Sequence, residues 1–278
     1  MSNAGAIRKD LAKRFGEEIS VDAGLSGLDE IARIAGHRVH RRYDGRPIDP
    51  ALLRLLCACA LSAPSKSDLQ QRDIVVVENP STRQTIADLI PDMPWIAQAP
   101  AFLVFCANGR RLAQIAKLRA KPFPNDHLDL LFNAATDAAL ALATFMDAAR
   151  AVGLGCCPIS VIRDHAARIS ELLSLPEKVI PYAGLCVGWP ATRGRISARL
   201  PLAMTVHVDR FRDDDFAVQL AAYDARRAAL QPYAAQRDPQ TWGEAAHYGW
   251  SEDKARQYGQ PQRTGFGAYV RARGFNPE

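Results

Sequence analysis

Apolar residues along the chain form short runs that alternate with stretches of helical spacing. Short β-branched or aromatic runs predict buried strands at 73–78, 100–107 and 182–190, a short extended piece within 153–160 and a further strand near 204–208. Apolar spacing, with Asp-Pro or Asn-Pro at two of the starts, predicts helices at 49–61, 79–90, 110–119 and 164–176. Helices that alternate with strands in this way indicate an α/β or α+β protein.

The longest predicted helix covers 128–152, which contains neither Gly nor Pro and is apolar on almost every side. A helix without a polar face must be covered on several sides. We therefore expect this segment to be either the central helix of the core or the centre of a subunit interface.

The composition is that of an ordinary globular protein. Of the 278 residues, 48% are hydrophobic and 23% are charged, which excludes the disordered and fibrous classes. The net charge of +5 is small and is not concentrated in blocks, so nucleic acid is not an expected partner. Neither a signal peptide nor a run of 18 apolar residues is recognisable, and we expect a cytoplasmic protein without membrane contact.

The familiar motifs of catalysis and metal binding are missing from the sequence. The six cysteines include no CxxC pair and lie mostly in apolar runs, so we expect buried free thiols and no metal. There is no P-loop, GxSxG or HExxH, and GLGCCP at 153–158 lacks the third glycine of a dinucleotide fingerprint. This points to a bound cofactor as the source of the chemistry.

Four separated polar segments could contact such a cofactor: HRVHRR at 37–42, SAPSKSDLQQ at 62–71, GLGCCPIS at 153–160 and RGRISARLP at 193–201. Clustered cations suit a dianionic phosphate, and a loop rich in hydroxyls supplies donors and acceptors. Glycines let the backbone approach a flat ligand closely. Taken singly, each segment is better explained as a solvated strand, a turn or a surface loop.

In this order, the four segments resemble the nitroreductase family, in particular its branch of NADPH-dependent oxygen-insensitive nitroreductases and FMN reductases. Further stretches typical of that branch are 98–115, 172–191, 237–242 and the Gly274-Phe275 ending. The resemblance implies an α+β fold with a central mixed or antiparallel sheet flanked by helices. It also implies a domain at 37–278, whose residues 213–278 form a helical excursion and tail, preceded by a helical extension at 1–36. Members of the family are homodimers with FMN sites at the dimer interface.

The resemblance also assigns an FMN site by position. His37, Arg38 and Arg199 match residues that hold the FMN phosphate, and Arg41 matches a basic residue near the N1 and C2-oxygen edge of the flavin. Ser65, Lys66, Ser67 and Gln70 match the loop that lines the ribityl chain and the ring edge. Met93 stands where the branch has a glutamine near the flavin. Backbone groups near N5 are matched by Pro158, Ile159, Ser160 and Val161.

The sequence departs from the family pattern at three places. Val39 stands where the family has a serine after the opening basic pair, and Ser160-Val161 replaces a Gly-Gly pair. Ser197 replaces the lysine before the closing arginine. His40 or Arg42 is the candidate replacement at the phosphate.

The expected function is oxidation of NADPH or NADH by hydride transfer to flavin N5, followed by reduction of a nitroaromatic, a quinone or free flavin in a ping-pong cycle. No side-chain general base is required. Arg237, in the loop 231–242, either reads the 2′-phosphate of NADPH or pairs with Asp238 or solvent. The alternatives are the same fold and FMN with a different flavin reaction, or a non-enzymatic binding protein.

Overall fold

The computed structural model describes residues 2–278 and divides them into two compact units. One unit holds the chain up to Arg38 together with Arg195–Gln262, and the other holds Val39–Gly194 and Arg263–Glu278. Among the described residues, only the second unit contains a sheet. The division into 1–36 and 37–278 stays a prediction.

The sheet of the second unit has four strands in the order β1-β2-β4-β3, and every pair is antiparallel. Its strands are β1 (Arg72–Val76), β2 (Ala101–Asn108), β3 (Gly155–Ile159) and β4 (Val179–Gly188). The central strands β2 and β4 are buried almost throughout, as their continuous apolar runs require. The expected α+β class with an antiparallel sheet is confirmed.

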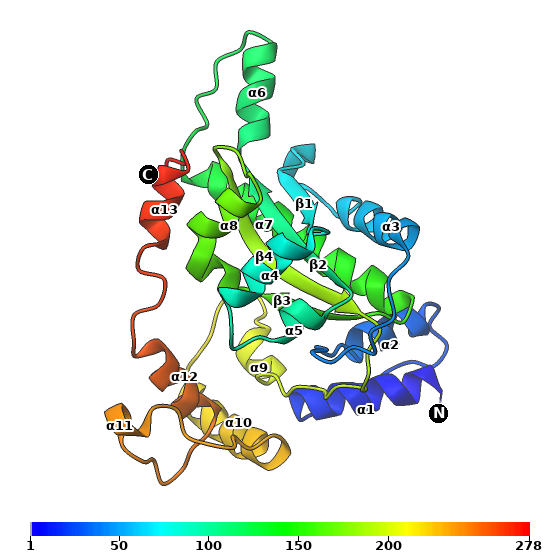
Figure 1. The fold of residues 1–278 in the computed structure, drawn as a ribbon. Coiled ribbons are helices and arrows are strands. Elements are labelled where there is room, and N and C mark those ends of the chain that lie inside the picture. The colour runs from blue at the N-terminus through cyan, green and yellow to red at the C-terminus, as the bar shows by residue number, and fades with distance from the viewer. Residues whose placement is uncertain (1) are drawn as a thin grey trace. The chain divides into compact units, whose positions relative to one another are not determined.

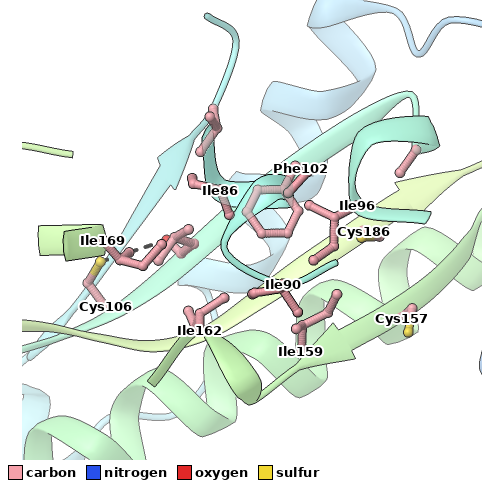
Figure 2. Packing of buried hydrophobic residues seen from close by; sticks show 14 of the residues in the cluster. Ile86, Ile90, Ile96, Phe102, Cys106, Cys157, Ile159, Ile162, Ile169 and Cys186 are labelled. Carbon is pink, nitrogen blue, oxygen red and sulfur yellow. Dashed lines mark hydrogen bonds between the residues drawn. The ribbon is translucent and has the colours of Figure 1, made fainter. Parts of the chain in front are cut away.

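Alternate residues of β2 enter two different cores because side chains alternate between the faces of a sheet. Phe102, Val104 and Cys106 pack with residues of α4 (Pro80–Asp88), α5 (Trp95–Gln98) and α8 (Ala166–Leu172). Figure 2 shows this cluster, in which Phe102 lies near Ile86, Ile90 and Ile96. Leu103 and Phe105 belong to the other core, with residues of α3 (Pro50–Leu61) and α7 (Leu128–Ala151).

Helix α7 spans the length predicted for it and packs against α3 and β2 (Figure 1). By length and composition it could cross a membrane, the one such helix in the described part of the chain. Leu128, Phe132 and Leu140 are exposed along one side of it, so the expectation of cover on several sides is not met within one chain. One face of α7 is open.

The cysteines are free, as expected, and none of the described residues forms a cluster of metal ligands. Cys106, Cys156, Cys157 and Cys186 are buried, whereas Cys57 and Cys59 are half-buried. Burial raises the pKa of Cys106 and of Cys156 to about 12, so both are neutral thiols at physiological pH.

The remaining helices of the second unit are η1 (Lys66–Asp68), α6 (Arg110–Leu118), η2 (Val161–His165) and α13 (Phe266–Ala272). The first unit contains α1 (Asn3–Phe15), α2 (Leu28–Ala35), α9 (Leu202–Thr205), α10 (Phe216–Leu230), α11 (Pro239–Trp242) and α12 (Trp250–Tyr258). Helix α1 packs on α2, and α10 packs on α12 through Tyr223 and Trp250, whose ring centroids are 5.4 Å apart.

Two local predictions were wrong. The segment expected as a strand near 204–208 contains the end of the short helix α9, and Val206 and Val208 are exposed. Alternating β-branched residues form a strand only where a neighbouring strand pairs with them. The helix expected from Asp164 begins at Ala166, after the tighter turn η2, with His165 at its N-cap position. Short 3-10 turns before a helix shift its start in this way.

Candidate functional site

The three residues expected at the FMN phosphate all lie in the first unit. Arg38 follows the end of α2, and its guanidinium donates to the Gly36 carbonyl at 2.6 Å and lies 3.5 Å from a carboxylate oxygen of Asp10. Arg199 is exposed and its guanidinium donates to its own neighbour, the Ala198 carbonyl, at 3.2 Å. The side chain of His37 is half-buried. This unit therefore supplies two guanidinium groups and an imidazole from two separate segments.

Arg41, expected near the flavin edge, lies in the second unit. Its guanidinium carbon is 5.3 Å from the ring centroid of Trp95, so an exposed cation is held against an aromatic face. Burial raises the pKa of the Cys157 thiol, and the nearby Arg41 partly opposes that shift. The structure thus places Arg41 beside Cys157 of β3 and Trp95 of α5.

The chain around Arg41 is fixed by bonds to the sheet. The backbone N–H of His40 donates to the Cys156 carbonyl at 2.9 Å, and the Tyr43 hydroxyl donates to the His40 carbonyl at 2.8 Å. A Cβ at Gly155 would lie 2.7 Å from the His40 ring, so this glycine admits the imidazole. The backbone of the GLG turn was expected to approach a flat ligand. At Gly155 it instead approaches the imidazole ring of His40. Val39 packs against the apolar core.

The hydroxyl-rich loop between α3 and β1 is held by a carboxylate from α7. Asp137 is fully buried and accepts from the Ser65 hydroxyl at 2.8 Å, from the Lys66 N–H at 3.1 Å and from the Gln71 N–H at 2.8 Å. The guanidinium of Arg72 lies 3.4 Å from the same carboxylate, and the two side chains are 4% and 0% exposed. Neither Asp137 nor Arg72 was singled out from the sequence.

Arg72 closes the same loop from its other side. Its guanidinium donates to the carbonyls of Leu61 and Ala63, each at 2.8 Å, and to that of Pro64 at 3.4 Å. Within the loop, three residues other than glycine have positive φ: Ser67 at 47°, Asp68 at 57° and Gln70 at 51°. Such backbone angles cost energy and persist only where surrounding contacts enforce them.

The other expected ligand positions of the second unit are arranged as follows. Ser67 and Gln70 are exposed, and the Gln70 amide donates to Asp68 at 3.0 Å. The ammonium of Lys66 lies 3.7 Å from Asp129 on α7. Met93 and Val161 are half-buried against the first core, Ile159 is buried, and Pro158 and Ser160 are exposed where β3 ends.

Arg237, expected either to read a 2′-phosphate or to pair with Asp238, has a different partner. Its Nε lies 3.4 Å from Asp253 of α12, whose carboxylate also accepts from the Tyr248 hydroxyl at 2.8 Å. Asp238 instead accepts from the Thr241 N–H at 3.2 Å and caps α11. Of the alternatives considered for Arg237, the pair with Asp238 is not the one found, since Asp238 accepts from Thr241 and Gln260.

Comparison with known proteins now defines the family. The models of the nitroreductase family and of its C-terminal domain match residues 34–189 and 197–278. An FMN reductase [NAD(P)H] of Bacillus subtilis is 34% identical over 198 residues, which cover 70% of this chain and 79% of the relative. An oxygen-insensitive NADPH nitroreductase of Salmonella typhimurium is 33% identical over 201 residues, covering 71% of this chain and 80% of the relative.

A solved structure, the NADPH:FMN oxidoreductase of Vibrio harveyi complexed with NAD+, aligns with a TM-score of 0.77 at 26% identity. The alignment covers 88% of this chain and 98% of that one. The fold is thus the α+β fold of these enzymes, and the chain belongs to the nitroreductase family.

The buried carboxylate generates a prediction about stability. Asp137→Asn leaves the Arg72 guanidinium buried without its counter-charge, and should lower the free energy of unfolding by about 3–5 kcal/mol. Asp147→Asn on the same helix is the matched control, since Asp147 pairs with Arg150 at the surface and is 48% exposed. That control should cost less than about 1 kcal/mol. Urea unfolding followed by circular dichroism measures both, and equal losses would contradict the assigned role of Asp137.

Proposed function

We propose that this protein is an FMN-dependent oxidoreductase that passes hydride from NAD(P)H to a small-molecule acceptor. The acceptors proposed are nitroaromatics, quinones or free flavin, reduced in a ping-pong cycle. The observation that carries the proposal is that the chain belongs to the nitroreductase family, whose models match residues 34–189 and 197–278. Two relatives named for FMN reduction and NADPH-dependent nitroreduction support it.

The chemistry of the donor set fits FMN. The first unit offers cations from two segments, which suits the dianionic phosphate, and this set is assigned to it: His37, Arg38 and Arg199. The second unit offers two cations, hydroxyls, an amide and exposed backbone, which suit the ribityl chain and the ring: Arg41, Ser65, Lys66, Ser67, Gln70, Met93 and 158–161. Val39, also expected to be a cofactor-binding residue, packs against the apolar core and is kept in the proposed site.

When bound, FMN would supply the acceptance of hydride at N5 and its delivery to a second substrate. The protein supplies binding and electrostatics. Arg41 is permanently charged and is braced against Trp95, so it offers a fixed cation to the N1 and C2-oxygen edge of the ring. The N–H groups of Ser160 and Val161 are assigned to N5. No residue is assigned the role of general base.

We also propose that the protein works in the cytoplasm.

The test of this proposal is spectroscopic and kinetic. The purified protein should be yellow with the absorption bands of an oxidised flavin, and anaerobic NADPH should bleach them. Addition of a nitroaromatic should then restore the oxidised spectrum with multiple turnovers. A colourless protein that takes up no FMN would overturn the proposal. A bleached flavin that no nitroaromatic, quinone or free flavin reoxidises would indicate a different flavin reaction.

Replacement of Arg41 should change the reduction potential of bound FMN more than it changes the affinity for FMN. Arg41→Ala removes a cation from the proposed N1 edge and should lower the reduction potential of bound FMN by on the order of 30 mV, about 1.4 kcal/mol for a two-electron couple. Arg41→Lys should recover part of this shift. Arg46→Ala is the matched control, because Arg46 also stacks on an indole, Trp189, at 4.7 Å. Redox titration measures the potentials, and identical values for Arg41→Ala and its parent would remove Arg41 from the ring edge.

The open face of α7 supports a proposed homodimer. Its exposed residues follow a spacing of about four: Leu128, Phe132, Thr136, Leu140 and Ala143. Leu128 is 52% and Phe132 is 67% exposed, which leaves large apolar side chains in water along one helix. A second copy of the chain would cover this stripe, and obligate dimers bury on the order of 2,000 Å² or more.

A charge placed on this stripe should therefore disrupt the dimer. Ala143→Asp should reduce the dimer fraction at low micromolar concentration and release FMN together with it, because the family shares its cofactor sites across subunits. Ala167→Asp is the control, as Ala167 is exposed on α8. Light scattering with an absorption detector reports mass and flavin content together. An FMN-loaded monomer of the parent protein would contradict the proposed assembly.

The choice of nicotinamide is tested at Arg237. If this arginine reads the 2′-phosphate of NADPH, Arg237→Ala should raise the KM for NADPH, with a loss of about 1.5–3 kcal/mol in kcat/KM, and should leave the KM for NADH nearly unchanged. Steady-state kinetics with both nucleotides decides the matter. Equal losses for both would assign Arg237 to the fold through its contact with Asp253.

A further inference from the structure

The N-terminal helix α1 lies before the part of the chain that the family models match, which starts at residue 34. It nevertheless contributes a buried arginine to the first unit: Arg14, in its last turn, is 6% exposed. Figure 1 shows α1 beside α2, the helix that ends immediately before the basic segment. A long cationic side chain is buried only where its donors are satisfied.

The guanidinium of Arg14 donates to carbonyls of two segments that are distant in sequence. It donates to Ala35 at 3.1 Å and to His37 at 2.8 Å, at the end of α2 and just beyond it. It also donates to Ser197 at 3.3 Å. One planar fork therefore ties the start of the basic segment to the segment that carries Arg199, a geometry that a lysine ammonium cannot reproduce.

The backbone of Arg14 holds Arg199 directly. The N–H of Arg199 donates to the Arg14 carbonyl at 2.7 Å, and Arg226 of α10 donates to that same carbonyl at 3.1 Å and to the Arg199 carbonyl at 2.6 Å. Both peptide groups of Arg199 are thus fixed from neighbouring helices. Its position depends on where α1 ends.

A second residue of α1, Asp10, forms an ion pair with Arg38, the other arginine expected at the phosphate. The carboxylate of Asp10 lies 3.5 Å from the guanidinium of Arg38, and the two side chains are 18% and 16% exposed. A Cβ at Gly36 would lie 3.2 Å from the same carboxylate oxygen, so the glycine leaves the space in which this pair forms. Helix α1 therefore contacts both segments that carry the expected phosphate ligands.

We propose that α1 is a positioning element for the phosphate monoester of the cofactor, and that Arg14 is its central residue. Arg14 does not bind the phosphate. It fixes the backbone from which His37, Arg38 and Arg199 reach it. This inference rests on the proposed function, in which FMN is the cofactor.

The test separates phosphate recognition from flavin binding as a whole. Apoprotein is titrated with FMN and, separately, with riboflavin, which lacks the phosphate, and the ratio of the two dissociation constants is compared among variants. Arg14→Met should reduce the preference for FMN over riboflavin by about tenfold or more, with riboflavin affinity little changed. Arg8→Met is the matched control on the same helix, since Arg8 only donates to the Val21 carbonyl at the surface, and its ratio should equal that of the parent.

A conservative variant keeps the test decisive where Arg14→Met does not fold. Arg14→Lys preserves the charge but reaches fewer carbonyls, so its FMN preference should still fall well below that of the parent. Full retention of the preference in Arg14→Lys, or equal losses for FMN and riboflavin in both variants, would overturn the positioning role. A parent protein that binds neither flavin, or binds both equally, would instead contradict the proposed FMN site, which makes the two failures distinguishable.

Discussion

The carboxylate of Asp137, in the middle of a largely apolar helix, is the contact on which the second unit depends. A charge in that position is stable only when hydrogen bonds and a counter-charge surround it. The partners it has are the hydroxyl of Ser65, the N–H groups of Lys66 and Gln71, and the guanidinium of Arg72. The loop between α3 and β1 is therefore joined to α7, and its three left-handed residues are enforced by that attachment.

The same attachment sets the start of the sheet. Gln71 is the last residue of the loop, and Arg72 is the first residue of β1. In the sheet, Arg72 pairs with Ala107 of β2. Beyond that pair, the alternation of side chains sends one set of β2 residues toward α7 and the other toward α4, α5 and α8. The loop that we propose as part of the FMN site and the strand that follows it are thus both attached to one buried residue, Asp137.

Much of this fold was predictable because its signals are local. Continuous apolar runs identified β2 and β4, and Asp49 and Asn79 before proline marked the starts of α3 and α4. The expected strand near 204–208 was wrong because strand pairing is a long-range property that alternation alone does not determine. Arg14, Arg72 and Asp137 were missed for the same reason. Their contacts span up to 183 positions, as between Arg14 and Ser197, and a charged residue in a helical pattern gives no local sign of burial.

Arg14 and Arg72 perform the same physical task in different units. The last carbonyls of a helix have no partner within it, and a cation near them is favoured by the helix dipole. Arg72 donates to Leu61, the last residue of α3, and Arg14 donates to Ala35, the last residue of α2. Each helix is followed within a few residues by a segment assigned to FMN. A helix end is an abrupt change of backbone direction, so a guanidinium that binds carbonyls on both sides of it fixes the exit angle of the chain. In the proposed mechanism the protein contributes binding geometry and electrostatics, so these fixed backbone directions set the positions of the cations that we propose as FMN ligands.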